Sequence, residues 1–394
     1  MRVKLKDAFN LQMGKTPSRS DLSLWGGNNK WISIADIGSA KKQISSTKEC
    51  ITDEGVSRSG IKVVPEGTVI MSFKLSIGKT AIVSEDMYTN EAIMAFIDNG
   101  TYCIDPNYLY HLCCGTDWTQ GGNKAVMGLT LNKATLSEME IELPTLEEQR
   151  EIASILDQLD AIIEKRHDEL NMIEQLVKSR FIELFGDMLL NDMAWQESTL
   201  DALADVVSGI TKGRKIRETE LIEVPYMAVS NVKDGYIDWT TVKTIFATKQ
   251  EIEQYRLLPY DVLMTEGGDP DKLGRGAVIT EPLKNSIHQN HIFRVRLQTE
   301  KILPVFFSEY LQHQKAKRYF LRSAKQTTGI ASINMKQLRA LPVLVPPLEL
   351  QEQFAAFVEQ TDKSKYYSSL SVHSCQQAAS YYRQEWITCR TSNS

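Results

Sequence analysis

The sequence has no long hydrophobic run, no paired cysteines and no strong net charge, and each absence excludes a class of protein. A membrane-spanning helix needs about 18 consecutive apolar residues, and no segment of the 394-residue chain approaches that length. None of the six cysteines forms a C-x-x-C pair or lies near histidine at zinc-ligand spacing, so we expect packed thiols and no metal site. Residues 1–7 carry no apolar signal core, and we expect a cytoplasmic protein without membrane contact.

Motifs for nucleotide binding and catalysis are also missing. Gly78-Lys79-Thr80 resembles the end of a phosphate-binding loop, but Phe73 stands where that motif requires glycine. Val-Pro-Pro-Leu at 345–348 lacks the polar residue that would hold a target amino group, and no carboxylate-x-lysine follows Asp271. We therefore predict a chain that is not itself an enzyme, has no catalytic residues and binds no cofactor of its own.

The net charge of −5 hides an uneven distribution. Residues 144–190 hold eleven acidic and five basic side chains, whereas residues 191–345 hold eighteen acidic and twenty-one basic ones. The remaining segments are nearly neutral. An overall basic field is absent, so any contact with a nucleic acid must be local or shared with partner subunits.

The chain contains an internal sequence repeat. Residues 5–14 match residues 200–209 at an offset of 195. From Asn132, which matches Asn334, the offset is 202 through a loop, a proline and a helix. A match that continues without gaps through three kinds of segment indicates an internal duplication.

Each repeat is a globular region followed by a long helix. Apolar runs at 63–72 and 261–265 are typical of short strands, and helical stretches are expected at about 106–114 and 304–325. We predict an α+β fold with two tandem α/β-mixed domains separated by two long helices. The predicted boundaries are 1–143 and 189–345 for the domains, and 144–188 and 346–394 for the helices.

The first long helix carries a heptad pattern. Proline and acidic residues at 143–148 mark its start, and Gly186 is a stop signal. Apolar residues recurring every seven positions favour a coiled coil, with an amphipathic helix lying on its own domain as the alternative. The predicted seam consists of Ile152, Leu156, Leu159, Ile163, Leu170, Ile173, Val177 and Leu184.

The second long helix is the expected partner, although its seam is weaker. Phe354, Val358 and Val372 lie on the seam, and Lys365 and Ser368 interrupt it. We predict that the two helices pack antiparallel and form a rod of roughly 55 Å, at ~1.5 Å per residue. Such a rod would hold the two domains at a fixed separation, related by a pseudo-two-fold axis.

Two similar but non-identical domains on a rigid spacer suit a two-part linear target. Duplex DNA is such a target, because half-sites on one face lie about one helical turn, roughly 34 Å, apart. Divergence between the domains would permit an asymmetric site. The alternative is a scaffold whose two domains bind protein. A steep dependence of DNA binding on salt distinguishes the two hypotheses, because phosphate contacts release counterions.

The helix starts and the segments around them carry a resemblance to a known family. The motifs are Leu-Pro-Thr-Leu-Glu-Glu-Gln (143–149), Val-Pro-Pro-Leu-Glu-Leu-Gln (345–351), Ile-Leu-Asp-Gln-Leu-Asp (155–160), Lys-Ser-Arg-Phe (178–181), Leu-Phe-Gly-Asp (184–187) and Thr-Thr-Gly-Ile-Ala-Ser-Ile-Asn (327–334). With these motifs the chain resembles, over nearly its whole length, the specificity (S) subunits of type I restriction-modification systems.

The resemblance implies that DNA recognition, methylation and cleavage are carried out by different subunits of one complex. Each globular region would be a target recognition domain that reads one half of a split site in double-stranded DNA, and the helices would set the gap. Two methyltransferase (M) subunits, which bind S-adenosylmethionine and methylate adenine, would dock on the helices. Motor-endonuclease (R) subunits would complete a complex that cleaves unmethylated DNA. The missing catalytic motifs argue against a self-sufficient methyltransferase.

The candidate DNA-binding residues come from three loop regions that the duplication places in both domains. The first is 14–19 with 209–215, the second is 74–79 with 267–275, and the third is 119–124 with 326–328. Base edges are read by Arg, Lys, Asn, Gln, Ser and Thr, and basic groups contact phosphates. For any one basic residue, a solvated surface charge is the alternative. The basic stretch from Lys315 to Lys325 adds phosphate-binding candidates. The predicted residues are Lys15, Thr16, Ser18, Arg19, Lys74, Lys79, Gln120, Asn123, Lys124, Lys212, Arg214, Lys215, Lys272, Arg275, Lys325, Gln326, Thr327 and Thr328.

Overall fold

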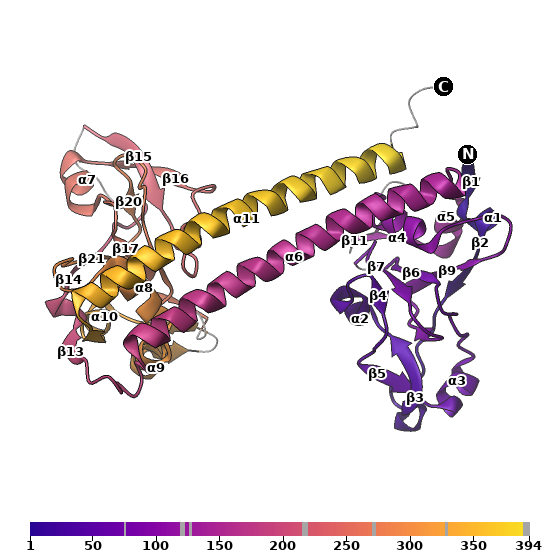
Figure 1. Ribbon diagram of the computed structural model, residues 1–394, viewed down its shortest axis with the longest axis horizontal. Coiled ribbons are helices and arrows are strands. Elements are labelled where there is room, and N and C mark those ends of the chain that lie inside the picture. Colours follow the sequence, from indigo (N-terminus) through magenta and orange to yellow (C-terminus); the bar gives the residue numbers. More distant parts are fainter. Residues whose placement is uncertain are drawn as a thin grey trace. The chain divides into compact units, whose positions relative to one another are not determined.

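The computed structural model describes residues 1–74, 76–118, 123–125, 128–214, 220–269, 273–327 and 330–388 (Figure 1). The chain forms two compact units. The first unit contains residues 1–168 and 369–394, and the second contains residues 169–368. Each unit therefore holds one globular region together with part of both long helices.

The first unit is built on a five-stranded sheet with the strand order β2-β9-β6-β7-β4. The strands are β2 (Phe9–Met13), β9 (Ile93–Asp98), β6 (Val69–Ser72), β7 (Thr80–Val83) and β4 (Gln43–Ile44). Successive residues of a strand point to opposite faces. Val69 and Met71 accordingly join one hydrophobic core, and Ile70 joins another. Burial on both faces explains the near-continuous apolar run around β6.

A smaller three-stranded sheet lies beside the first and has the order β5-β3-β8. We call the sheet with its adjacent helices the first lobe. Trp31, Ile51 and Ile61 form its own small core. The lobe comprises β5 (Glu49–Ile51), β3 (Trp25–Ile32), β8 (Tyr88–Thr89), η1 (Leu22–Leu24), α2 (Ile34–Ser39) and α3 (Asp53–Ser59).

The second unit repeats this arrangement. Its main sheet has the order β14-β21-β17-β19, and its lobe, the second lobe, has the sheet order β16-β15-β20. In both lobes the central strand pairs antiparallel with one neighbour and parallel with the other. The elements are β14 (Ala204–Ser208), β21 (Ile292–Leu297), β17 (Val262–Thr265), β19 (Gly276–Val278), β16 (Lys243–Ala247), β15 (Ile222–Met227), β20 (Ile287–His288), η3 (Val229–Asn231) and α7 (Lys249–Tyr255).

Two equivalent glycines show that the repeat extends to close backbone contacts. A Cβ atom on Gly14 would lie 2.0 Å from the Thr89 carbonyl oxygen, and one on Gly209 would lie 1.9 Å from that of His288. Only glycine fits at either position. The shared topology and these paired contacts confirm the duplication that the sequence predicts.

Each globular region is closed by a strand pair and short helices before its long helix. The first has β1 (Arg2–Lys4) paired with β12 (Glu140–Glu142), and the second has β13 (Gln196–Thr199) paired with β24 (Pro342–Val345). The accompanying helices are α1 (Leu5–Ala8), α4 (Pro106–Gly115), α5 (Lys133–Glu138), η2 (Leu200–Ala202), α8 (Pro304–Gln312), α9 (Gln314–Ser323) and α10 (Met335–Arg339).

The single helical stretch predicted at about 304–325 is wrong in one respect. The structure has two helices there, α8 and α9, separated by His313 in an extended conformation with φ −75° and ψ 153°. Ala316 and Phe320 of α9 belong to the main core of the second unit. The turn at His313 brings this second helix onto that core, which the continuous helical pattern of the sequence does not reveal.

The long helices are α6 (Leu146–Phe185) and α11 (Leu348–Thr388), drawn in magenta and yellow in Figure 1. α6 ends where predicted, because Gly186 adopts a φ of 74° that only glycine takes up freely. Within the second unit, Phe181 and Phe185 of α6 contact Phe354 of α11, with ring centroids 5.4 and 5.7 Å apart. Phe306 of α8 completes this aromatic cluster.

The predicted seam residues differ in how far they are buried. Leu156, Val177, Phe354 and Val372 are buried. The remaining seam residues, Ile152, Leu159, Ile163, Leu170, Ile173, Leu184 and Val358, are half-buried. Ser368, which interrupts the apolar pattern, is nevertheless buried. Coiled-coil pairing along the whole length of the helices stays a prediction.

Candidate nucleic-acid interface

The first predicted region, which contains Lys15, is held rigidly against the first lobe. The Lys15 backbone N–H donates to the Thr89 carbonyl oxygen at 2.9 Å, and the Trp31 indole donates to the Lys15 carbonyl oxygen at 3.0 Å. The Lys15 ammonium donates to the Ser59 carbonyl oxygen at 3.1 Å. The side chain is exposed, and this contact uses one of the three donors of its ammonium group.

Arg19 has a strong partner inside the first lobe. Its guanidinium donates to both carboxylate oxygens of Glu49 and lies 3.8 Å from the ring centroid of Trp25. The hydrogen bond with Glu49 raises the pKa of Arg19 and lowers the pKa of Glu49. A paired and stacked guanidinium of this kind stabilises the strand arrangement around it. Thr16 also has a partner within the chain, because its hydroxyl donates to Glu91.

Arg214, at the matching position of the second repeat, is paired in the same way. Its Nε and Nη2 atoms each lie 2.5 Å from an oxygen of Glu251, at the start of α7. Glu251 also accepts from the backbone N–H of Thr248 and so caps that helix. The side-chain hydrogen bond raises the pKa of Arg214 and lowers that of Glu251. The neighbouring Lys212 is exposed.

The second predicted region follows the central strands β6 and β17. In the first unit, Lys74 lies with its ammonium 5.2 Å from the Phe73 ring centroid, and Lys79 is exposed. In the second unit, the Nε atom of Arg275 is buried and has no hydrogen-bond partner within the described part of the chain. Gly274 beside it has a φ of 73° and packs against the Phe320 ring of α9.

The third predicted region is a hairpin in both units. β10 (Asn123–Ala125) pairs with β11 (Gly128–Thr130), and β22 (Lys325–Thr327) pairs with β23 (Ile330–Ser332). In the second unit, β23 also pairs with β18 (Gly267–Gly268). The second and third predicted regions therefore meet in one sheet, which the sequence could not show.

Several predicted residues lie wholly or partly outside the described part of the chain. Gln120, Lys215, Lys272 and Thr328 lie outside the described residues. Asn123, Lys124, Gln326 and Thr327 are described as strand residues, but their side chains are not. Lys325 is exposed at the start of β22, and Ser18 is exposed in the first lobe, where its hydroxyl contacts that of Ser20 at 2.9 Å. A direct role in DNA binding stays a prediction for all of the selected residues.

A groove of about 720 Å³ runs along β2, the edge strand of the first main sheet. Among the described residues that line it are four lysines and no carboxylate; the lysines are Lys6, Lys15, Lys62 and Lys133. Lys6 donates to Glu138 at 2.5 Å, while Lys62 and Lys133 are exposed. Sequence reasoning missed Lys62 and Lys133, because they stand 71 positions apart and the edge strand alone brings them together.

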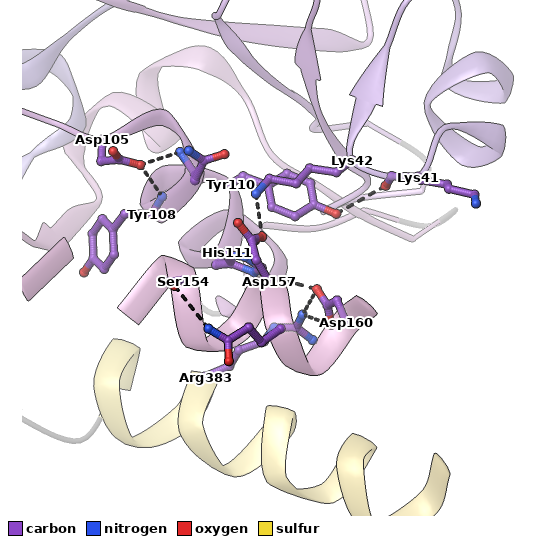
Figure 2. Close-up of polar contacts among 12 residues, drawn as sticks. Lys41, Lys42, Asp105, Tyr108, Tyr110, His111, Ser154, Asp157, Asp160 and Arg383 are labelled. Atoms are coloured by element: carbon purple, nitrogen blue, oxygen red, sulfur yellow. Dashed lines mark hydrogen bonds and ion pairs between the residues drawn. The ribbon is translucent and has the colours of Figure 1, made fainter. Parts of the chain in front are cut away.

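A cluster of polar residues joins the first globular region to both long helices within the first unit (Figure 2). His111 of α4 lies 2.8 Å from Asp157 of α6, which also accepts from Lys42 at 2.5 Å. Arg383 of α11 donates to both oxygens of Asp160, at 2.8 and 2.7 Å. This cluster fixes the orientation of α4 relative to the helices of its own unit.

The titration of this cluster follows from burial and charge. Burial lowers the pKa of His111, although Asp157 beside it acts in the opposite direction. Burial alone would raise the pKa of Asp157, but hydrogen bonds from Lys42 and His111 lower it below its usual value. The cluster is therefore held by the Asp157 carboxylate and by ion pairs, with a neutral imidazole.

The described residues contain no group of three or more His, Cys, Asp or Glu side chains arranged to hold a metal ion. Their helices also include none that is long and apolar enough to cross a membrane. The candidate side chains that the structure describes in the two units are basic or small and polar, a composition suited to phosphates and base edges.

A family model described as the type I restriction modification DNA specificity domain matches residues 1–175 and, again, residues 193–366. The chain belongs to this specificity family. The two separate matches coincide with the two repeats, and the resemblance predicted from the helix starts is confirmed.

Curated relatives in the specificity family are similar over most of the chain. The MjaIX specificity subunit of Methanocaldococcus jannaschii is 22% identical over 379 residues, covering 90% of this chain and 85% of that protein. The StySPI specificity subunit of Salmonella potsdam is 25% identical over 325 residues, covering 76% and 68%. The EcoKI specificity subunit of Escherichia coli is 22% identical over 326 residues, with the same coverage.

Two solved structures share the fold. The type I restriction-modification S subunit from M. genitalium superposes with a TM-score of 0.56 at 15% identity, covering 98% of this chain and 96% of that one. A chain from a study of complex assembly and conformational transition of the type I R-M system gives 0.57 at 16% identity, with the same coverage. These similarities confirm the mixed α/β class with long helices.

The motif that indicates the specificity family most clearly has a structural cause. Gln149 of α6 accepts from the Asp105 N–H at 2.9 Å and donates to the carbonyl oxygens of Cys103 and Pro144, both at 3.1 Å. Gln351 of α11 repeats this pattern, as it accepts from the Leu303 N–H at 2.8 Å. Both glutamines are buried, so they tie each helix start to its own globular region.

Proposed function

We propose that this chain is the DNA-recognition (specificity) subunit of a type I restriction-modification complex and that it reads an asymmetric, bipartite site. The observation that carries the proposal is the duplication of a specificity-family domain whose two copies share sheet order but differ in the chemistry of their loops. Gly78-Lys79 in one copy corresponds to Gly274-Arg275 in the other, and the hairpin sequences differ throughout. Two such copies suit two different half-sites.

In this proposal, basic and polar groups of each unit contact the duplex. Lys15, Ser18 and Lys79 would do so in the first unit, with Lys62 and Lys133 on phosphates along the β2 groove. Lys212, Arg275 and the β22–β23 hairpin would do so in the second. Arg19 and Arg214 would act indirectly, because each is paired with a glutamate and holds its lobe in shape.

The long helices would form the antiparallel, pseudo-two-fold spacer between the half-site readers. Support comes from contacts inside each unit: Phe181 of α6 with Phe354 of α11 in the second, and Asp160 of α6 with Arg383 of α11 in the first. A pair that joins the end of one helix to the start of the other is what antiparallel packing produces.

The chemistry would be supplied by partners. Two methyltransferase subunits carrying S-adenosylmethionine would dock on the helices, and motor-endonuclease subunits would add cleavage. The proposal that this chain contributes no catalytic group rests on the absence of methyltransferase and nuclease motifs from the whole sequence. The specificity subunits among the relatives are named as parts of type I restriction enzymes, which supports the same assignment.

The salt dependence of DNA binding tests this proposal against a protein-binding scaffold. The chain is assembled with its methyltransferase partners and titrated with a duplex between 50 and 200 mM salt. A complex that makes roughly 6–10 phosphate contacts should lose about 10³–10⁵ in affinity over that range. Absent or salt-insensitive DNA binding would support the scaffold and exclude the recognition role.

A further inference from the structure

Among the described helices and strands, α9 carries the highest net positive charge, with four basic and no acidic side chains. Residues 314–327 contain five basic side chains and no Asp or Glu. The five are Lys315, Lys317, Arg318, Arg322 and Lys325. Such a run is unusual in a chain whose net charge is −5.

One face of α9 is anchored in the core, which fixes where the charges point. Ala316 and Phe320, four residues apart, are fully buried, and Lys315 is tied to Glu197 at 2.7 Å. Because positions four apart share a helix face, the opposite face points to solvent. Arg318 and Arg322, also four apart, are exposed on it.

The exposed positive charges of Arg318, Arg322 and Lys325 are not paired with carboxylates among the described residues of the chain. Among the described residues, Arg318 donates only to the side-chain oxygen of Gln314, at 3.3 Å. Across that described part of the chain, Arg318, Arg322 and Lys325 form no ion pair with a carboxylate. A rigid helix presenting unpaired guanidinium groups is suited to phosphate, which guanidinium binds with two parallel hydrogen bonds.

α9 also lies against the predicted reading loops of the second unit. The Phe320 ring packs on Gly274, where an added Cβ would approach it to 2.3 Å. The helix ends at Ser323, and β22 begins at Lys325. Since β22 pairs with β23 and β23 with β18, the helix leads directly into the sheet that unites the second and third predicted regions.

The first unit fills the equivalent place differently. Gly78, which corresponds to Gly274, faces the Trp118 ring, at 3.5 Å from an added Cβ. Trp118 therefore packs where Phe320 does, but it follows α4 after only a short turn. Among the described residues of the first unit, none forms a helix between α4 and the β10–β11 hairpin.

We propose that Arg318, Arg322 and Lys325 form a phosphate-binding surface, the α9 anchor, that grips the duplex backbone beside the half-site read by the second unit. The inference rests on the proposed function and adds an asymmetry to it. Phosphate contacts fix position and strengthen binding without reading sequence. The second unit thus holds DNA partly through an element that has no helical counterpart among the described residues of the first.

The test uses the complex of the full chain with its methyltransferase subunits. The triple variant Arg318→Gln/Arg322→Gln/Lys325→Gln is compared with a matched control, Lys243→Gln/Lys284→Gln/Lys301→Gln, which removes three exposed lysines of the same unit. Each complex is titrated with two duplexes over a range of salt concentrations. One duplex contains the DNA sequence that the wild-type complex methylates, and the other lacks it. All exchanged side chains are exposed, and thermal unfolding verifies that the fold is retained.

The α9 anchor should account for about three counterions. The slope of log K against log salt should become shallower by roughly 2–3 in the anchor variant, at about 0.9 per contact, with equal loss on both duplexes. The control variant should change this slope far less. In both variants the DNA sequence that becomes methylated should be the same as in the wild type. An unchanged slope in the anchor variant, or a changed base preference at one position, would overturn the inference.

Two further outcomes separate this inference from the proposed function. If the wild-type complex itself binds DNA without salt dependence, the proposed function fails and the anchor fails with it. If the wild-type complex binds normally but the anchor variant no longer co-purifies with the methyltransferase subunits, the surface binds protein, and only the anchor is refuted.

Discussion

The buried glutamine at the start of each long helix shows how a family signature can arise from folding alone. Gln149 and Gln351 each satisfy one backbone N–H and two carbonyl groups, including the carbonyl of the proline five residues earlier. Buried backbone groups that lose such partners cost about 1–3 kcal/mol each. The spacing from proline to glutamine is therefore explained by contacts within the chain.

Replacing the second of these glutamines should destabilise its unit strongly. Gln351→Ala leaves the Leu303 N–H and the carbonyl groups of Lys301 and Pro346 without partners, and we expect a loss of about 2–4 kcal/mol. Gln353→Ala, an exposed position two residues along α11, is the matched control and should change stability by less than about 0.5 kcal/mol. Equal unfolding midpoints for the two variants in chemical denaturation would contradict the assignment.

His288 is a second residue whose role is structural. Its two ring nitrogens lie 3.2 and 3.3 Å from the carbonyl oxygens of Tyr255 and Val207, and the neutral ring can donate to one of these two oxygens at a time. Burial lowers the pKa of His288 to about 4, and nearby Arg294 acts in the same direction. The imidazole is therefore neutral at pH 7.

This pKa predicts acid sensitivity. Because the folded pKa is below the unfolded value near 6.5, the contribution to stability is complete above pH 6.5 and declines as the pH falls toward 4. The loss should reach about 3 kcal/mol. His288→Leu should make the unfolding midpoint less dependent on pH between 6.5 and 4.5 than it is in the wild type. Parallel pH profiles for the two proteins would show that His288 does not titrate as described.

At the scale of elements, the sequence predicts periodic features well and spatial neighbours poorly. The heptads of α6, the stop at Gly186 and the apolar strand β6 follow from local pattern, because each depends on residues close in the chain. The break at His313 does not, since it is decided by how α9 meets the core. The sequence does not predict the intrachain partners of Arg19 and Arg214 either, because Glu49 and Glu251 lie 30 and 37 positions away.

Lengthening both long helices by one heptad tests their proposed role as a spacer. Seven residues are inserted after Asp168 in α6 and, to keep the proposed antiparallel register, after Ser368 in α11. At ~1.5 Å per residue the addition is about 10 Å, or roughly three base pairs of DNA. Mapping of methylated sites should show both half-sites unchanged and the gap longer by about three base pairs. Methylation at the original spacing would refute the spacer.

At the scale of the whole molecule, duplication allows two recognition surfaces to diverge on one framework. Both copies keep the same order of four strands in the main sheet, the close-packed glycine and the buried glutamine, while the sequences of the lobes and hairpins differ. Contacts that hold the fold are thus shared, and side chains exposed on the loops vary. This separation is what independent reading of two half-sites requires.

Exchanging one globular region should change one half-site only. Residues 191–345 are replaced by the corresponding region of another specificity subunit, with both long helices retained. The new methylated sequence should keep one half and the gap, and acquire the donor's other half, because each globular region has its own core. A change in both halves would show that the two regions do not read independently.

The most direct measurement is single-molecule sequencing of methylated adenines in cells with and without this chain, with the partner methyltransferase subunits present in both. The account predicts one bipartite, asymmetric motif with a fixed gap that is methylated only when the chain is present. Methylation of the same sequence in its absence, or no change in adenine methylation on adding it, would contradict the claim that this chain selects the DNA site.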